Sequence, residues 1–374
     1  MAQSTNLMAA HHQWAVRPDD ERWAGNDQFG PLVELYNYKE QFKSNAKSIV
    51  IANRDVRAHP VEGDDHGLVV VGPGNAPAIP TWWATGQLCQ RAGAPASYIR
   101  DLPSPLAADC INWGLDNREV EEIGVYLHKN GGPATVRAFT GKGYGRIHDA
   151  DVLKALIQRF GDGRSGDFRV PGEFGKRVEI TKRNTTVYGS DHDIWVFLAD
   201  EDHRIEGPNR RDGKSGSMAR GFFLWNSEVG AATLGIDTFL YDYVCCNRIV
   251  WGAQDVARIR IRHTSGAPWR WIEEVAPAIE EYSASSTKSI LEAINTAKQK
   301  KLGAKDKVIE FLSKRFTRSQ AASFVKIHEE EEHRPIESLW DAATAVTAYA
   351  RSLPHQDTRV DLERKAGALL DLAA

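Results

Sequence analysis

The order of strand-like and helix-like segments along this chain limits the folds that it can adopt. Between residues 123 and 265, short stretches such as ATVRAFT and DIWVFLAD have the apolar patterns of strands. The stretch HDADVLKALIQRF interrupts them with the spacing of a helix, and helical patterns continue from Ile272 onward. Strands grouped apart from helices are typical of an α+β protein. The sequence therefore predicts a mixed or antiparallel central sheet with packed helices and a helical C-terminal region.

The length of 374 residues exceeds what one core usually contains, so several structural regions are expected. Short strands come first, and TWWATGQLCQRAG and SPLAADCINWGLDN then have the spacing and end signals of helices. We expect an N-terminal α/β region over residues 1–122, a basic sheet-rich core domain over 123–270 and the helical C-terminal region over 271–374. The apolar stretch IDTFLYDYVCCNRIV, residues 236–250, is predicted to form a buried helix.

The composition indicates a globular protein without a membrane span. Apolar residues make up 42% and charged residues 26%, and no run of about 18 apolar residues exists. The first residues lack the basic and apolar segments of a signal peptide. The four cysteines form no CxxC pair, so neither a disulfide framework nor a zinc site is expected. These features predict a cytoplasmic protein with no membrane partner.

Positive charge is concentrated in the middle of the chain, although the net charge of the whole chain is only −3. Residues 131–270 hold 21 lysine and arginine residues against 17 aspartate and glutamate residues, whereas the two flanking parts are acidic. A basic middle region favours a polyanion such as nucleic acid as its partner.

Three arginines alternate with isoleucines in the stretch RIRIRHTSGAPWRW. Because successive side chains of a strand point to opposite faces, Arg258, Arg260 and Arg262 are predicted to share one face. The tryptophans that follow, of which Trp269 is the first, are suited to stack on nucleobases. On a purely structural strand, the same arginines would form a charged edge that prevents aggregation.

Further basic residues flank a second predicted strand and a glycine-rich turn. Arginine and lysine side chains in such places are suited to phosphate contacts, and the turn TGKGYGR also offers a ring for stacking. The predicted nucleic-acid-binding residues are Arg258, Arg260, Arg262, Lys176, Arg177, Lys182, Arg183, Trp269 and Tyr144. Binding to the phosphate backbone is independent of base sequence and is weakened by salt.

Three motif-like stretches do not meet the requirements of the sites that they resemble. The glycines of GKGYGR alternate, whereas a dinucleotide-binding loop needs a different spacing directly before a helix. GPNRRDGKS has one residue too many for a P-loop, and a strand pattern follows it. The histidines of HEEEEH stand about 140° apart around a helix, so they cannot chelate one zinc ion. No cofactor and no bound metal are expected.

A second hypothesis rests on carboxylates beside two predicted strands. Asp191 and Asp193 precede IWVFLAD, and Glu228 follows FFLWNS. Carboxylates bind hard metal ions, so a metal-dependent nuclease or another enzyme using these three residues is the alternative function. Aspartates are also common in turns beside strands, and no lysine or glutamate at nuclease spacing accompanies them. A protein without catalytic activity therefore remains the first hypothesis.

The segments VRAFTGKGYGRIHDADVLKAL, SDHDIWVFLAD, RGFFLWNSEVGAATLGIDTFLYDYVCCNRIVWGA and RIRHTSGAP resemble, in this order, landmarks of one protein family. It is the phage/plasmid-like protein family, catalogued as domain of unknown function 932, and the similarity extends over roughly residues 85–350. The resemblance implies carriage on a bacterial mobile element and an intracellular role, but it supplies no reaction and no catalytic residues. This chain departs from the family between Gly141 and Tyr144, where a Ser-Asp-Arg-Tyr-like turn is usual.

The order of strands, helix and strands over residues 123–265 is similar in architecture to the single-strand annealing proteins of mobile elements. We therefore expect a protein that binds single-stranded DNA or RNA along a basic groove and assists annealing or recombination without catalysis. Self-assembly into a homo-oligomer is part of this expectation. A third hypothesis is a protein-interaction module that binds no nucleic acid.

Overall fold

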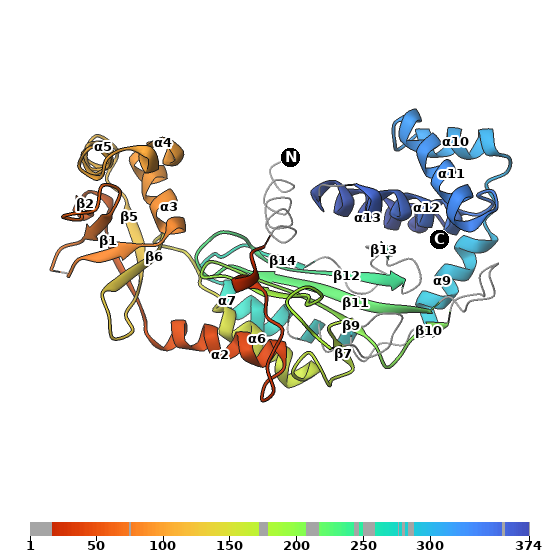
Figure 1. The fold of residues 1–374 in the computed structure, drawn as a ribbon, viewed down its shortest axis with the longest axis horizontal. Helices are drawn as coiled ribbons and strands as arrows, with labels where there is room; N and C mark the ends of the chain where they lie inside the picture. The colour runs from red at the N-terminus through yellow and green to blue at the C-terminus, as the bar shows by residue number, and fades with distance from the viewer. Residues whose placement is uncertain are drawn as a thin grey trace.

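The structure, a computed structural model, consists of three parts that follow one another along the molecule (Figure 1). One sheet with its helices lies at one end, a second sheet lies in the middle, and the C-terminal helices lie at the other end. The described residues are 17–74, 76–171, 179–206, 217–242, 247–249, 259–275, 277–278, 281–282, 288–353 and 356–373. Among the helices of these residues, none combines the length and the apolar character that a membrane crossing requires.

The N-terminal sheet has six strands in the order β1-β5-β6-β4-β3-β2, and only β4 and β6 are parallel neighbours. Its strands are β1 (Ala46–Ala52), β2 (Arg57–Pro60), β3 (Leu68–Val71), β4 (Ala78–Pro80), β5 (Glu122–His128) and β6 (Ala134–Gly141). The helices packed on it are α3 (Trp82–Ala92), α4 (Ala96–Asp101) and α5 (Ser104–Asp116). Leu88 of α3 and Ile111 of α5 pack with Val125 and Phe139 in the core of this part.

The helices predicted from TWWATGQLCQRAG and SPLAADCINWGLDN are confirmed, and the first ends at the expected glycine. The hydroxyl of Thr81 accepts a hydrogen bond from the backbone N–H of Ala84 at 3.1 Å, which caps α3. Gly93 ends this helix in the left-handed conformation, at a φ of 69°. The short 3-10 turns before residue 60 are η2 (Asn53–Asp55), in the N-terminal part, and η1 (Asp19–Glu21), which lies near β8 of the central sheet.

Strands β5 and β6 complete the N-terminal sheet, so the boundary that we expected after residue 122 falls inside this part. β5 pairs with β1 along its whole length, and β6 pairs with β4. Both β1 and β4 lie before residue 122 in the chain. No local sequence pattern marks the pairing of strands that lie far apart in the chain. The sequence analysis therefore placed a domain boundary between them.

The central sheet is antiparallel in the order β13-β12-β11-β9-β7, with β14 beside β12, β8 beside β9 and β10 beside β11. Its strands are β7 (Phe168–Arg169), β8 (Val187–Gly189), β9 (Ile194–Asp200), β10 (Ile205–Glu206), β11 (Ser217–Asn226), β12 (Leu234–Asp242), β13 (Asn247–Ile249) and β14 (Ile259–Ile261). Helices α2 (Pro31–Ser44) and α6 (Asp149–Phe160) lie against one face (Figure 1). The aromatic residues of the opposite face are Tyr188, Trp195, Phe197, Phe223 and Trp225.

The helix predicted within residues 236–250 is wrong, because this range contains most of β12 and all of β13. Ile236 belongs to the core beneath α6, whereas Asp237 binds Arg260 on the other face, so the chain alternates as a strand does. Residues on both faces of β12 are buried, so its sequence lacks the apolar-in, polar-out alternation that marks a half-exposed strand. Residues 243–246 and 250 lie outside the described residues.

A helical region completes the chain, as predicted. Before it come the short α7 (Ala267–Arg270) and the π-helical turn η3 (Trp271–Val275). Its elements are α9 (Lys288–Gln299), α10 (Lys305–Ser313), α11 (Arg318–Glu332), α12 (Leu339–Ser352), α13 (Gln356–Leu370) and η4 (Asp371–Ala373). Met218 and Leu240 of the central sheet are part of the same core, so these helices and the sheet are packed together. The α+β class with a helical C-terminal region is confirmed.

Candidate functional site

The loop of residues 226–230, with the sequence NSEVG, is the centre of a buried polar cluster. The side-chain amide of Asn226 donates a hydrogen bond to Asp149 Oδ1 at 2.7 Å. The hydroxyl of Ser227 donates to the backbone oxygen of His192 at 2.6 Å. Both side chains are fully buried, and buried polar groups are stable only when they are hydrogen-bonded. These bonds fix the loop to the start of α6 and to the turn before β9.

Glu228 of this loop binds groups from the N-terminal sheet and from the start of α6. Arg137 of β6 forms an ion pair with Glu228 and also donates to the backbone oxygen of Asp191. His148 Nδ1 lies 3.4 Å from Glu228 Oε2, and the backbone N–H of Asp149 donates to the same oxygen at 3.3 Å. The side chains of Arg137 and Glu228 are each 1% exposed. A buried ion pair therefore joins the two sheets.

Two further buried ion pairs lie beside the first. Lys39 of α2 places Nζ 2.7 Å from Asp149 Oδ2 and donates to the backbone oxygen of Ser190 at 2.6 Å. Arg17 pairs with Asp193, the residue that precedes β9. None of these four charged side chains is more than 7% exposed. Charged groups from the N-terminal segment, α2, β6, α6 and the start of β9 thus meet in one cluster.

The pKa values of Glu228, within the loop, and of Asp149, which the loop binds through Asn226, shift in opposite directions. Burial opposes ionisation of Glu228, but the hydrogen bond from His148 and the charge of Arg137 hold its pKa below the usual value. Burial raises the pKa of Asp149 to about 6 against the opposing charge of Lys39. The cluster therefore keeps Glu228 as a carboxylate, which is the form that pairs with Arg137.

Replacing Asp193 with asparagine is expected to change how stability depends on pH. Burial opposes ionisation of Asp193, but Arg17 outweighs it and lowers the pKa to about 2, against about 3.9 in an unfolded chain. The ionised carboxylate therefore stabilises the fold above about pH 4, and this contribution is lost as the pH falls from about 4 to about 2. We expect D193N to be less stable than the parent at pH 7 and the difference to shrink in that interval.

Urea unfolding at several pH values between 2 and 7 measures this difference in the free energy of unfolding. Asp109→Asn, at an exposed position of α5, is the matched control and should behave like the parent. A difference between D193N and the parent that stays constant down to pH 2 would contradict a stabilising pair with Arg17.

The three carboxylates of the enzyme hypothesis each face a basic side chain. The pairs are Arg137 with Glu228, Arg17 with Asp193, and His192 with Asp191 at 2.8 Å. A metal ion at these oxygens would have to displace the basic groups that already bind them. Among the described residues, no three His, Cys, Asp or Glu side chains have the arrangement of a metal site. The geometry is that of a structural joint.

Of the three alternating arginines, Arg260 and Arg262 are described. Arg260 of β14 donates to both carboxylate oxygens of Asp237 at 2.8 Å, and its guanidinium carbon lies 4.2 Å from the centre of the Trp225 ring. Ile261 points to the opposite side and is buried, so the predicted alternation is confirmed across β14. Arg262 follows the strand and is exposed. Arg260 is therefore neutralised within the fold, whereas Arg262 faces solvent.

The other predicted basic residues do not join Arg262. Lys182 and Arg183 are exposed and precede β8, which lies about 19 Å from β14, a distance of four strand spacings. Lys182 Nζ donates to the backbone oxygen of Asp19 at 2.6 Å. Outside the described residues lie Lys176, Arg177 and Arg258. The described members of the predicted set thus do not form one continuous basic groove.

The structure does bring the glycine-rich turn beside the segment that follows β14. The ring of Tyr144 stacks on His263, with centroids 4.9 Å apart and planes 15° apart. The Tyr144 hydroxyl donates to the backbone oxygen of Ser227 at 2.8 Å. Gly145 N donates to the backbone oxygen of His263 at 3.1 Å, and a Cβ at Gly145 would lie 1.7 Å from Thr264 O. His263 therefore occupies a face of Tyr144 that was predicted to stack on a base.

Two exposed tryptophans belong to the helices that reach this region, α7 beside Gly145 and α3 beside Val229. Trp269 of α7 and Trp82, the first residue of α3, are each 68% exposed. The guanidinium carbon of Arg100 lies 3.9 Å from the centre of the Trp82 ring, and Arg100 donates to Trp82 O at 2.8 Å. The sequence predicted Trp269 as a stacking residue but treated Trp82 only as part of a helix. The adjacent Trp83 is turned inward and donates to the backbone oxygen of Val229 at 3.3 Å.

Helix α3, which begins with Trp82, contacts the NSEVG loop where the two sheets meet. Gln87 of α3 also donates to the backbone oxygen of Val229, at 2.8 Å. The next residue is Gly230. A Cβ added there would lie 3.3 Å from Gln87 Nε2 and 3.7 Å from Tyr144 Cε2. The contact continues from Tyr144 to His263 and the segment after it. We call this region the junction surface, formed by Trp82, Gln87, Arg100, Tyr144, Gly230, Arg262, His263 and Trp269.

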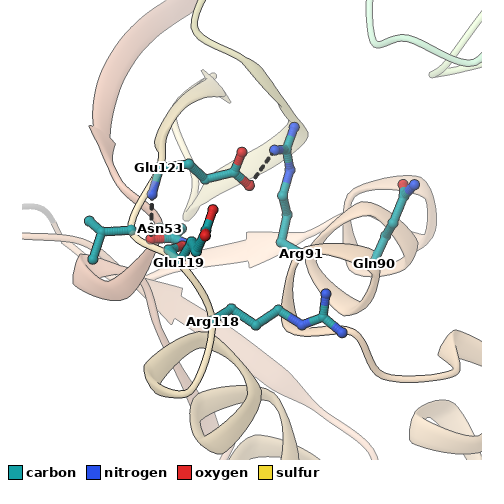
Figure 2. A pocket seen from close by; sticks show the side chains of 7 residues that line it. Asn53, Gln90, Arg91, Arg118, Glu119 and Glu121 are labelled. Carbon is teal, nitrogen blue, oxygen red and sulfur yellow. Dashed lines mark hydrogen bonds and ion pairs between the residues drawn. The ribbon is translucent and has the colours of Figure 1, made fainter.

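A hollow of about 570 Å³ lies at the other end of α3 (Figure 2). Its lining residues are Asn53, Gln90, Arg91, Arg118, Glu119, Val120 and Glu121. Arg91 pairs with Glu121 at 2.6 Å, and the Asn53 amide donates to the backbone oxygen of Glu119 at 2.9 Å. Two arginines and two glutamates balance each other, so the lining selects neither an anion nor a cation. The junction surface is therefore the stronger candidate site.

A family model described as Domain of unknown function (DUF932) matches residues 175–369, which is more than half of the chain. No curated protein and no solved structure matches the chain. The matched segment includes the NSEVG loop and the C-terminal helices, whereas Trp82 and Arg137 lie before it.

Proposed function

The chain belongs to the family Domain of unknown function (DUF932), and because this description names no reaction, we propose a function from the geometry of the chain itself. The proposed function is binding of single-stranded nucleic acid at the junction surface, without chemical catalysis. The observation that supports it is that Trp82 and Trp269 are exposed on two helices that reach the region of the NSEVG loop, and that Arg262, five residues before α7, is exposed as well.

The chemistry of the two ends of the junction surface suits a flexible polyanion with flat bases. Every nucleobase can stack on an indole ring, and a single-stranded chain leaves its bases free to do so. Arg100 and Arg262 can bind phosphate oxygens at the same time, because a guanidinium group is always charged. This binding distinguishes single from double strands by base accessibility and does not read the sequence.

A role in strand annealing or recombination extends this proposal. It is supported by the resemblance to the phage/plasmid-like family and to single-strand annealing proteins, which implies carriage on a mobile element. The buried ion pair between Arg137 and Glu228 fits a binding protein, since the Glu228 carboxylate holds the two sheets together instead of facing a substrate. Parallel binding assays with oligothymidine and oligouridine would separate a DNA-binding from an RNA-binding protein.

Replacing either Trp82 or Trp269 with alanine is expected to weaken binding of a labelled oligothymidine about 10-fold or more. Loss of one base stack costs roughly 1–3 kcal/mol, and about 1.4 kcal/mol corresponds to a factor of ten. Fluorescence anisotropy of the labelled oligonucleotide measures the dissociation constant. The matched control is Trp113→Ala, because Trp113 is 70% exposed on α5 and is not part of the junction surface.

The affinity of the parent protein should also fall steeply between about 50 and 200 mM salt, as phosphate contacts require. Arg262→Ala should make this dependence shallower while retaining the fold, because Arg262 is exposed. Equal losses for W82A, W269A and W113A would place binding elsewhere. No binding by the parent at low salt would overturn the proposal and favour a protein-interaction module.

A further inference from the structure

Strand β1 forms one edge of the N-terminal sheet. All seven of its residues pair with β5, and no strand of the described residues pairs with its other side. None of the seven is buried, and Val50 is 54% exposed. Figure 1 shows this sheet at the end of the molecule away from the C-terminal helices. The outer side of β1 is therefore open to a partner.

The hydrogen bonds at the two ends of β1 show which of its backbone groups point outward. Asn53 N donates to Glu121 O at 2.9 Å, and Lys129 N donates to Asn45 O at 3.1 Å. In an antiparallel pair, hydrogen-bonded residues alternate with residues whose N–H and C=O point away from the partner strand. Odd-numbered residues therefore bind β5. The residues that direct N–H and C=O to the open side are Ala46, Ser48, Val50 and Ala52.

The two edges of this sheet differ in how they are protected from strand addition. The opposite edge, β2, has four residues with the sequence RAHP and ends at Pro60. Short length, charge and proline are the features by which sheet edges avoid pairing with other chains. β1 has the sequence AKSIVIA, with no proline and with Lys47 as its one charged residue. Each edge carries one charged residue, so β1 differs from β2 in its greater length and in its lack of proline.

We propose that β1 pairs antiparallel with β1 of a second copy of this chain. The strand is complementary to itself in the register that places Ile49 opposite Ile49, since Ser48 then faces Val50 and Lys47 faces Ile51. The two lysines do not meet, so no like charges oppose each other. The four outward residues of each strand form about eight hydrogen bonds across the new pair. The two N-terminal sheets become one continuous sheet.

The interface formed in this way is small. A pair of seven-residue strands buries less surface than the roughly 1,600 Å² of a standard stable interface. We therefore expect a weak dimer whose population rises with protein concentration. This proposal does not depend on nucleic-acid binding, and its test uses the protein alone.

Sedimentation equilibrium of the full chain over a wide concentration range measures the dimer dissociation constant. Val50→Pro removes one outward N–H and leaves the ladder to β5 intact, so it should raise this constant about 10-fold or more. Val50→Thr keeps the N–H and the branched shape and is the matched control. A parent that stays monomeric at all concentrations would overturn the proposal, as would V50P dimerising as well as the parent while keeping the parent's circular dichroism spectrum.

A disulfide between copies tests the register and does not depend on the proline variant. Residues in a hydrogen-bonded antiparallel pair have Cα atoms about 5.5 Å apart, which a disulfide can bridge. Ser48→Cys and Val50→Cys proteins should therefore cross-link with each other after mixing and oxidation, and mass spectrometry identifies the joined residues. Cross-linking of S48C to itself in preference to V50C would contradict the proposed register.

Discussion

Replacing Arg137 with leucine is expected to destabilise the protein by about 3–5 kcal/mol, because Glu228 would remain buried without its ion-pair partner. Both side chains are 1% exposed, so water cannot substitute for the guanidinium group. Arg137 also donates to the backbone oxygen of Asp191, and its guanidinium carbon lies 4.4 Å from the centre of the Phe42 ring of α2. The change therefore removes contacts that join β6 to the NSEVG loop and to α2.

Urea unfolding followed by circular dichroism measures this loss as a free energy of unfolding. Lys142→Leu is the matched control, because the pair of Lys142 with Glu122 is exposed and such pairs contribute little. Adding Glu228→Gln to Arg137→Leu removes the buried charge and should recover part of the loss. If R137L and K142L had the same small effect, the buried pair would not be what holds the two sheets together.

The second large effect is expected for Gly235→Ala. The added methyl group should lower the free energy of unfolding by about 1–3 kcal/mol. The added Cβ would lie 2.2 Å from Cζ2 of Trp225, so the indole ring would have to move. That ring has little freedom, because it stacks on Trp195 at 5.1 Å and lies under the guanidinium group of Arg260. Cross-strand neighbours form one row of side chains through Tyr188, Trp195, Trp225, Gly235 and Arg260.

Near-ultraviolet circular dichroism is the most direct measurement for this variant, since the tryptophan signals depend on fixed packing, and urea unfolding gives the free energy. Gly132→Ala is the control, because a Cβ at that position has nothing within 4 Å. Combining Gly235→Ala with Trp225→Phe provides room for the methyl group and should restore part of the stability. A G235A protein with the parent's spectrum and stability would show that the row of cross-strand side chains has room for the added methyl group.

The NSEVG loop connects the buried joint with the junction surface. Its residues Ser227 and Glu228 are buried and hydrogen-bonded, whereas Gly230 is exposed next to Gln87 and Tyr144. The same five residues therefore hold the two sheets in position and border the proposed binding surface.

Much of the fold follows from local patterns in the sequence. Helix α3 has a threonine cap and a terminal glycine, and α6 has apolar residues at helical spacing, so the amino-acid pattern alone locates both helices. The strand alternation of Ile259 to Ile261 is also a local pattern. The error at residues 236–250 arose because β12 is covered on both faces and carries no alternation.

The candidate site was predicted only in part. Trp269 was identified because it follows a run of basic residues, and Tyr144 because it lies in a glycine-rich turn. Trp82 was missed because the sequence TWW does not show which of its two adjacent tryptophans faces solvent. The predicted basic set also included Arg260, whose partner Asp237 lies 23 residues earlier in the chain.

Residues close together in the chain carry the information for single elements, because hydrogen bonds within a helix and side-chain alternation along a strand are local. The sequence was therefore sufficient for the class of the fold, its helical C-terminal region and its family. Only the tertiary structure determines which charged groups meet. A pair such as Arg137 and Glu228, 91 residues apart, forms only when packing removes both groups from water. The same packing neutralised Arg260 and left Arg262 in solvent.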